Sequence, residues 1–247
     1  MYILARVFST IEPTPKEILV RHQPSVLPIL CLRHGETKYT GQPNDLTLEG
    51  ESHVRHIAGS LVSSWMCASQ IAHRNLAIVS SPAPRARYTA EVVAEVLGYK
   101  GPIRIRNGLQ PMIWRDPVRA LAACKGLSGK GYVDYETEPV FADSTIFETP
   151  DEVKKRWYAF FSEHVRFALR FGPKHAIFVS HYEVFCSIVR DLFGIVATEA
   201  TALRYVEPIY LHVITTADVD QVVVVGGFRH RVAAVKFHLP TCSFHPV

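Results

Sequence analysis

The chain has 247 residues, of which 48% are apolar and 20% are charged, which is enough material for one large hydrophobic core. This composition excludes an intrinsically disordered protein, because disorder needs low hydrophobicity and a large excess of one charge. The net charge of +4 is spread along the sequence without a basic block, so we do not expect nucleic acid as a partner. Every apolar run is far shorter than the ~18 residues of a membrane span, so we expect no membrane-spanning segment.

The cysteine content and the N-terminus bear on the compartment. The cysteines are odd in number and contain no CxxC pair, which favours a reducing compartment over a disulfide scaffold or a zinc site: Cys31, Cys67, Cys124, Cys186 and Cys242. Residues 1–25 are predicted to form an N-terminal extension ahead of one domain at 26–247. They lack a long apolar signal segment, yet they carry Arg6 and no acidic residue before Glu12, as transit peptides do. A cytoplasmic protein is expected, with organellar targeting as the alternative.

Three short apolar runs, at 26–32, 76–79 and 176–179, are each followed by a segment with helical periodicity. The first helix is predicted after the capping residue Thr47, with an apolar stripe from Val54 to Trp65. The second covers 86–97, and the third covers 184–192. This alternation of strands and helices predicts a layered α/β fold with parallel strands.

The remaining segments complete the predicted organisation. A long helix is expected from the capping box of Thr149 and Glu152 to Gly172. Between 101 and 149, prolines and glycines interrupt every pattern, which predicts an irregular excursion over the sheet. The C-terminal third predicts strands at 209–214, 221–225 and 231–237, joined by tight turns.

Polar side chains stand at the carboxyl ends of the three predicted strands, which is where an α/β sheet binds its ligands. They are arginines, histidines and serines: Arg33, His34, Ser80, Ser81, Arg85 and His181. Two arginines and two histidines in one place form a site rich in hydrogen-bond donors for an anion with several oxygens. Phosphate is the expected ligand. A neutral imidazole is also a competent nucleophile toward phosphorus.

Four segments extend this pattern: Leu32-Arg33-His34-Gly35-Glu36-Thr37, Asp45-Leu46-Thr47 with Gly50, Ser80-Ser81-Pro82 with Arg85, Ala86, Thr89 and Ala90, and Val179-Ser180-His181. In this order and spacing they resemble the histidine phosphatase superfamily, also called the phosphoglycerate mutase-like family, over residues 29–194. The resemblance implies a three-layer sandwich, with a mostly parallel central sheet and helices on both faces. It also implies a phosphohistidine intermediate on His34, a phosphate pocket of Arg33, Arg85 and His181, and no metal or organic cofactor.

The sequence departs from the family at two places. Many members carry an asparagine soon after the Glu-Thr pair, where this chain has Lys38-Tyr39-Thr40. Members also carry Gly-Leu-x-Glu, whose glutamate donates a proton to the leaving group, and here Pro111 occupies the glutamate position. Since proline cannot donate a proton, the acid must come from elsewhere, or turnover is impaired. We expect Asp116, which follows Pro111 closely, ahead of Glu183.

The expected function is a phosphatase that hydrolyses a phosphomonoester, either a small metabolite or a phosphoprotein. The alternative is a phosphate-binding or scaffolding pseudophosphatase, and it is motivated by Pro111. A mutase ranks below both, because the chain is short between Thr40 and Asp45. Trp114, Tyr135 and Phe141 lie in the irregular excursion, where they either shape a substrate mouth or pack under a long loop. The oligomeric state is left open between a monomer and a homodimer.

Overall fold

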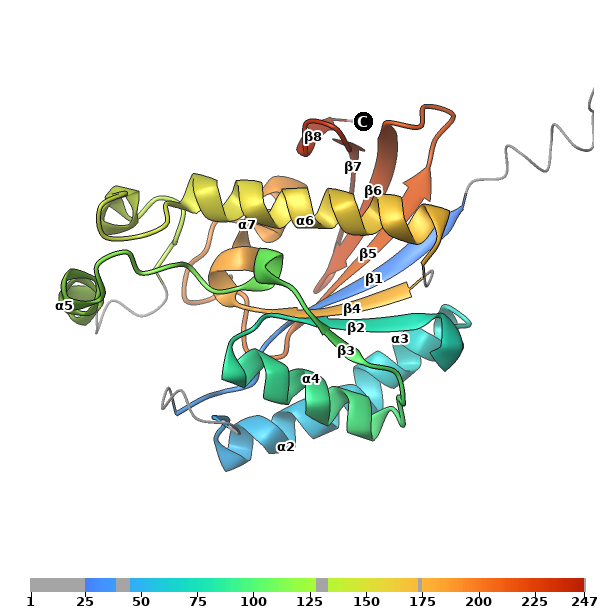
Figure 1. The fold of residues 1–247 in the computed structure, drawn as a ribbon, viewed down its shortest axis with the longest axis horizontal. Coiled ribbons are helices and arrows are strands. Elements are labelled where there is room, and N and C mark those ends of the chain that lie inside the picture. Colours follow the sequence, from blue (N-terminus) through green and yellow to red (C-terminus); the bar gives the residue numbers. More distant parts are fainter. Residues whose placement is uncertain (1–24, 39–44, 128–132, 173–174, 247) are drawn as a thin grey trace, which may run out of the picture.

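The strands of the protein form one sheet, in a computed structural model that describes residues 25–38, 45–127, 133–172 and 175–246. Within these residues the sheet has eight strands, in the order β3-β2-β4-β1-β5-β6-β7-β8 (Figure 1). They are β1 (Val26–Arg33), β2 (Leu76–Ser80), β3 (Ile103–Ile105), β4 (His175–Ser180), β5 (Pro208–Thr215), β6 (Gln221–Phe228), β7 (Arg231–His238) and β8 (Ser243–Pro246).

The sheet is mixed, and its two halves have different connections. Strand β1 pairs in parallel with β4, and β2 pairs in parallel with both β4 and β3, because helical crossovers join these strands. From β5 to β8 the pairing is antiparallel, and β5 runs antiparallel to β1. The tight turns predicted for the C-terminal third connect this antiparallel half.

Helices cover both faces of the sheet, which confirms the predicted three-layer architecture (Figure 1). One face carries α2 (Leu48–Ile57), a π-helical segment (Ala58–Val62), α3 (Ser63–Ala68) and α4 (Pro84–Val96). The other face carries α6 (Pro150–Arg170) and α7 (Tyr182–Phe193). Because successive side chains of a strand point to opposite faces, Ile29 and Leu30 of β1 belong to two separate core clusters, one under each helical layer.

The predicted helix boundaries follow from local capping chemistry. The Thr47 hydroxyl accepts a hydrogen bond from the Gly50 N–H, and so it caps α2. Thr149 and Glu152 form the predicted capping box of α6. Gly194 ends α7 with a φ of 64°, a left-handed conformation that glycine adopts without strain. Each of these helix ends is formed by residues close together in the sequence, so a short segment is enough to predict it.

The excursion between 101 and 149 is more ordered than its sequence suggests. It contributes β3 and helix α5 (Pro117–Leu127), with 3-10 turns at Asn107–Leu109 and Pro139–Ala142. Helix α5 was not predicted, because its three alanines, one cysteine and one glycine leave only a weak apolar stripe. In the structure this excursion passes over the carboxyl ends of the parallel strands (Figure 1).

Some sequence predictions lie outside the described residues. They include the N-terminal extension up to residue 24, with Arg6 and Glu12, and the stretch containing Tyr39 and Thr40. In the part of the chain that the structure describes, no helix combines the length and apolar character needed to cross a membrane.

Candidate active site

Three neighbouring parallel strands deliver the candidate site to one edge of the sheet. In the register of the sheet, Arg33 of β1 lies opposite Ser180 of β4, and Ser80 of β2 lies opposite Val179. The carboxyl ends of β1, β2 and β4 therefore lie side by side at the same edge of the sheet. The N–H of His34 donates to the carbonyl oxygen of Ser180 at 2.9 Å, which fixes the backbone of His34 against β4.

The imidazole of His34 is held in one tautomer. Its Nδ1 lies 2.7 Å from the carbonyl oxygen of Gly35, which can only accept a hydrogen bond, so Nδ1 carries the proton. The lone pair therefore resides on Nε2, which accepts a hydrogen bond from Nε of Arg85 at 3.1 Å. Burial and, to a smaller extent, the nearby Arg85 charge lower the pKa of His34 to about 3. His34 is thus a neutral imidazole with Nε2 as its nucleophilic atom.

Arg33 supplies a second guanidinium beside the histidine. It is buried, and it donates one hydrogen bond from Nη1 to the carbonyl oxygen of Leu203 at 2.8 Å. Its guanidinium carbon lies 4.0 Å from the ring centre of Tyr205 and 5.3 Å from that of Tyr182. Its Nε–H has no hydrogen-bond partner among the described residues. A buried N–H without a partner lowers the stability of the fold, and an anionic oxygen in the site would accept a hydrogen bond from it.

His181 is fully buried next to His34, and their ring centres are 5.1 Å apart. Ser81 Oγ accepts from the N–H of Ala83 and lies 2.7 Å from Nε2 of His181. Either atom can be the donor of this hydrogen bond, and Nδ1 of His181 has no partner in the described part of the chain. Burial, followed by the nearby His34, keeps the pKa of His181 well below its usual value.

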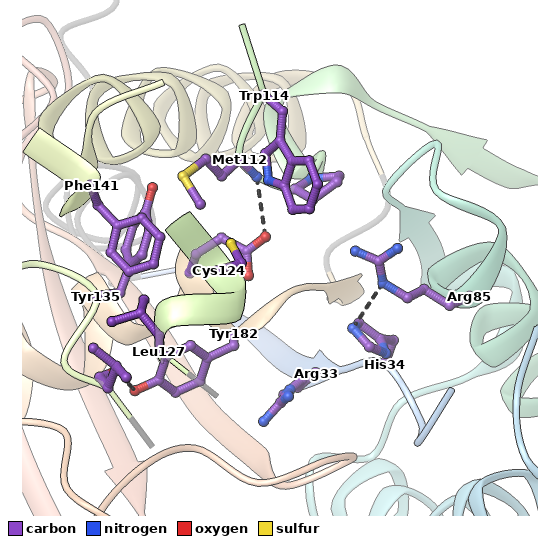
Figure 2. Close-up of a pocket in the computed structure, with 13 residues that line it drawn as sticks. Arg33, His34, Arg85, Met112, Trp114, Cys124, Leu127, Tyr135, Phe141 and Tyr182 are labelled. Carbon is purple, nitrogen blue, oxygen red and sulfur yellow. Dashed lines mark hydrogen bonds between the residues drawn. The ribbon is translucent and has the colours of Figure 1, made fainter. Parts of the chain in front are cut away.

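A cavity of about 620 Å³ opens next to these groups, and its size is typical of a small-molecule site (Figure 2). The fully buried His181 is not among the described residues that line it. Arg33, His34 and Arg85 form its polar end. The walls come from the excursion and from the start of α7. They are largely apolar or aromatic, with Met112, Trp114, Leu127, Val133, Tyr135 and Phe141 among them. Trp114, Tyr135 and Phe141 all line the cavity. Tyr135 and Phe141 are also buried and pack against each other, so both interpretations of the sequence apply to these two residues.

The two acid candidates lie in different places. Glu183, in the first turn of α7, lines the cavity, and its Oε1 accepts a hydrogen bond from the N–H of Met112 at 3.1 Å. Asp116 is not among the described residues that line the cavity. Its Oδ1 accepts from the N–H of Arg119 at 3.0 Å, and its carboxylate caps the start of α5. The position of Asp116 gives no support to the acid role that the sequence predicted for it.

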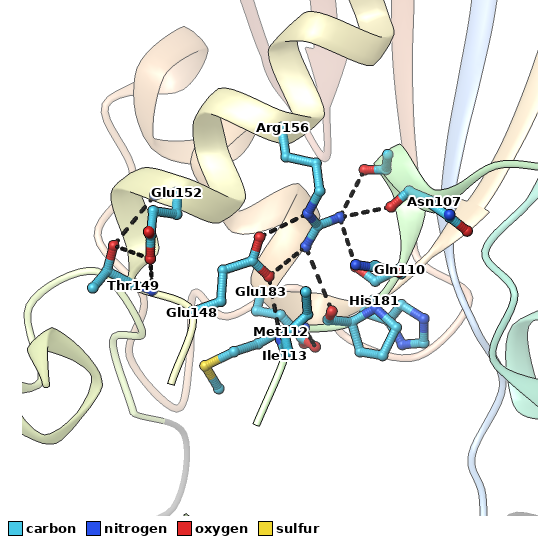
Figure 3. A network of polar contacts seen from close by, with 12 residues as sticks. Asn107, Gln110, Met112, Ile113, Glu148, Thr149, Glu152, Arg156, His181 and Glu183 are labelled. Atoms are coloured by element: carbon cyan, nitrogen blue, oxygen red, sulfur yellow. Dashed lines mark hydrogen bonds and ion pairs between the residues drawn. The ribbon is translucent and has the colours of Figure 1, made fainter. Parts of the chain in front are cut away.

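Arg156 of α6 holds the cavity wall around Pro111 in place (Figure 3). Its guanidinium makes two hydrogen bonds of 2.8 Å to the buried carboxylate of Glu148. It also donates to the carbonyl oxygens of Asn107, Gly108 and Gln110. Glu148 in turn accepts from the N–H of Ile113 at 3.2 Å. This network fixes the backbone that carries Pro111 and Met112, and no sequence pattern predicts it.

Comparison with known proteins places the chain in a family. The sequence profile of the histidine phosphatase superfamily (branch 1) matches residues 29–226. The chain belongs to this superfamily. The resemblance drawn from the four sequence segments is thereby confirmed. The motifs at Arg33, Arg85 and His181 all lie within the matched range.

Solved structures share the histidine phosphatase fold with this chain. A phosphoglycerate mutase from Bacillus anthracis has a TM-score of 0.54 and 14% identity, with 79% of this chain and 93% of that chain covered. A structure described as mycobacterial hydrolase 2 has a TM-score of 0.52 and 17% identity, covering 78% and 84%. A mycobacterial glucosyl-3-phosphoglycerate phosphatase in complex with VO3 has a TM-score of 0.51 and 20% identity, covering 75% and 92%. A search of curated proteins found no match.

The similarity to these solved structures establishes the fold. The reaction and the substrate have to be inferred from the residues of the site. Among the described residues, no group of three or more histidine, cysteine, aspartate or glutamate side chains could hold a metal ion. The candidate site combines histidines, arginines and a nearby carboxylate.

Proposed function

We propose that this protein is a phosphatase that hydrolyses a phosphomonoester through a phosphohistidine intermediate on His34. One observation carries the proposal. The neutral Nε2 of His34 faces the guanidinium of Arg85 at the polar end of the cavity, with Arg33 beside it. A nucleophile between two fixed cations matches what phosphoryl transfer requires, because its transition state is stabilised mainly by charge around the phosphoryl oxygens.

In the first step, Nε2 of His34 attacks the phosphorus atom and the ester P–O bond breaks in line with the new N–P bond. Arg33 and Arg85 donate hydrogen bonds to the phosphoryl oxygens, and His181 lies beside His34 as a further candidate donor. The leaving oxygen takes a proton from the carboxyl group of Glu183 and departs as an alcohol. In the second step, water attacks the phosphohistidine and gives a proton to the Glu183 carboxylate. The N–P bond breaks, and inorganic phosphate and free His34 result.

We assign the acid to Glu183 rather than to Asp116. Glu183 faces the same cavity as His34, whereas the Asp116 carboxylate is engaged at the start of α5. Pro111 also lines the cavity, at the position where the family's glutamate is expected. A carboxylate that reaches this cavity from α7 can replace the one that Pro111 removed. An active enzyme is therefore favoured over a pseudophosphatase.

The test is hydrolysis of an aryl phosphate by the purified protein and by its His34→Ala variant. The proposal expects turnover by the wild type and none by the variant. Equal activity in the two proteins would contradict it. If neither protein turns over while orthovanadate still raises the melting temperature of the wild type, the phosphate-binding pseudophosphatase is the correct account.

A further inference from the structure

The walls of the cavity differ sharply in character from its polar end. Beyond Arg33, His34 and Arg85, the one charged side chain among the described lining residues is Glu183. The walls do contain two tyrosines, but their hydroxyl groups are already used. Tyr135 donates to the carbonyl oxygen of Glu148 at 3.3 Å, and Tyr182 donates to that of Val133 at 3.4 Å. The tyrosines therefore contribute aromatic surface.

The charge distribution argues against a substrate with a second anionic group. The phosphoryl group engages Arg33 and Arg85, the two cationic residues among the described lining. A carboxylate or a second phosphate on the alcohol part would find no further cation among the described lining residues. A polyhydroxylated alcohol would lose hydrogen bonds to water, and the walls offer few in return.

The apolar wall is built into the fold. The Trp114 ring packs edge-on against Phe147, with ring centres 6.5 Å apart, and the two residues also form a β-bridge. Phe141 contacts both Tyr135 and Phe147, with ring centres at 4.9 Å and 5.3 Å. Aromatic clusters of this kind hold their geometry before a ligand arrives, which favours binding of apolar groups.

We propose that the substrate is a phosphomonoester of an apolar alcohol or phenol that carries no second charge. Its phosphoryl group binds Arg33 and Arg85 at the polar end. Its hydrocarbon part packs against Met112, Trp114 and Tyr135. This inference rests on the proposed phosphatase function and specifies its substrate class.

Primary alkyl phosphates test the proposal, because their leaving alcohols have nearly the same acidity and differ mainly in apolar length. Ethyl phosphate, hexyl phosphate and 3-phosphoglycerate are compared by kcat/KM on the wild type. Since each buried methylene is worth about fourfold in binding, hexyl phosphate should exceed ethyl phosphate by at least about tenfold. 3-Phosphoglycerate should be the poorest of the three. A substrate order with 3-phosphoglycerate first, or with ethyl equal to hexyl phosphate, overturns the proposal.

A matched pair of variants locates the origin of the preference. Trp114→Ala removes a ring from the wall, whereas Ile113→Ala removes an adjacent side chain of similar exposure that does not line the cavity. Trp114→Ala should lower the hexyl-to-ethyl ratio severalfold and leave inhibition by inorganic phosphate unchanged. Ile113→Ala should leave the ratio as in the wild type. Equal effects of the two substitutions would contradict a role for this wall.

A binding measurement separates this proposal from the proposed function. The His34→Ala variant cannot form the intermediate, so intact esters can be titrated into it by calorimetry. Suppose that the variant binds hexyl phosphate more tightly than ethyl phosphate, but the wild type hydrolyses neither ester. This result would contradict the proposed phosphatase function and support the proposed ligand class. Activity that depends on His34 but shows no chain-length preference in kinetics or binding would keep the function and overturn the ligand class.

Discussion

The Nε of Arg85 lies 3.1 Å from the Nε2 of His34 and donates a hydrogen bond to its lone pair. A phosphoryl group can reach that lone pair only by replacing this hydrogen bond, after which the guanidinium can turn to the phosphoryl oxygens. The hydrogen bond therefore lies on the path by which the phosphorus atom approaches Nε2 of His34. It also places the Arg85 guanidinium next to the nucleophile.

Substitution of Arg85 should damage catalysis far more than substitution of its neighbour. Arg85→Gln removes a cation from the polar end, and loss of one such donor typically lowers kcat about 100- to 1000-fold. Arg87 is exposed on the same helix, so Arg87→Gln should leave kcat unchanged. Steady-state kinetics on an aryl phosphate decides this. A similar loss in both variants would show a general charge effect instead of a specific contact.

Glu183→Gln should slow alkyl phosphates much more than activated aryl phosphates, because only a poor leaving group needs a proton. A positioned acid contributes about 100- to 10,000-fold, so the alkyl kcat/KM should fall within that range. Asp116→Asn is the control, since asparagine also caps a helix and Asp116 does not line the cavity. The opposite outcome, with Asp116→Asn selective for alkyl esters, would return the acid role to Asp116.

His34 should remain neutral at mildly acidic pH. Its pKa is lowered to about 3 by burial and by Arg85, whereas a free histidine is protonated below about pH 6.5. In phosphate-free protein, nitrogen NMR should therefore show the Nδ1–H tautomer unchanged from pH 7 to pH 5. The His34→Gln variant assigns the signal. Titration of this ring near pH 6.5 would contradict the described environment.

The same shift makes stability depend on pH. Below about pH 6.5 the unfolded chain binds a proton at position 34 that the folded protein excludes, so acid favours unfolding. His34 should contribute a loss of about 1.4 kcal/mol per pH unit between its two pKa values, and His34→Gln should remove that slope. An unchanged slope in denaturant titrations between pH 6 and pH 4.5 would mean that His34 is protonated in the folded state.

The four polar residues of the site could be predicted because each belongs to a short segment at a strand end. Arg33 ends β1, His34 follows it directly and His181 follows β4, so their placement needs only the parallel register of neighbouring strands. Glu183 was also within reach, since it lies two residues after His181 in the first turn of α7. Asp116 was ranked above it because Asp116 is near Pro111 in sequence. That proximity ignores the turn that leads into α5.

The cavity wall could not be predicted, because residues distant in sequence form it together. Met112 and Trp114 precede α5, whereas Tyr135 and Phe141 follow it, and no local periodicity connects them. The Arg156 network has the same character, since its partners come from 107–113 and from Glu148. Every residue has a backbone carbonyl that can accept a hydrogen bond, so the sequence does not indicate which residues accept one from Arg156.

Arg156 should matter for stability and for the shape of the cavity. Arg156→Met leaves the buried Glu148 carboxylate without its partner, which typically lowers the free energy of unfolding by about 3 to 5 kcal/mol. Lys155→Met, on the exposed face of the same helix, should change it by less than about 0.5 kcal/mol. Denaturant unfolding of both variants measures the difference. Equal stability would mean that the network does not hold the 107–113 segment.

The most direct measurement of the central claim is chemical identification of the intermediate. The protein is mixed with a phosphomonoester carrying a labelled phosphoryl group, quenched in alkali, and digested for mass spectrometry. We expect an acid-labile, base-stable phosphoryl group on His34, which is absent from His34→Ala. Label on another residue, or hydrolysis that continues in His34→Ala, would contradict it.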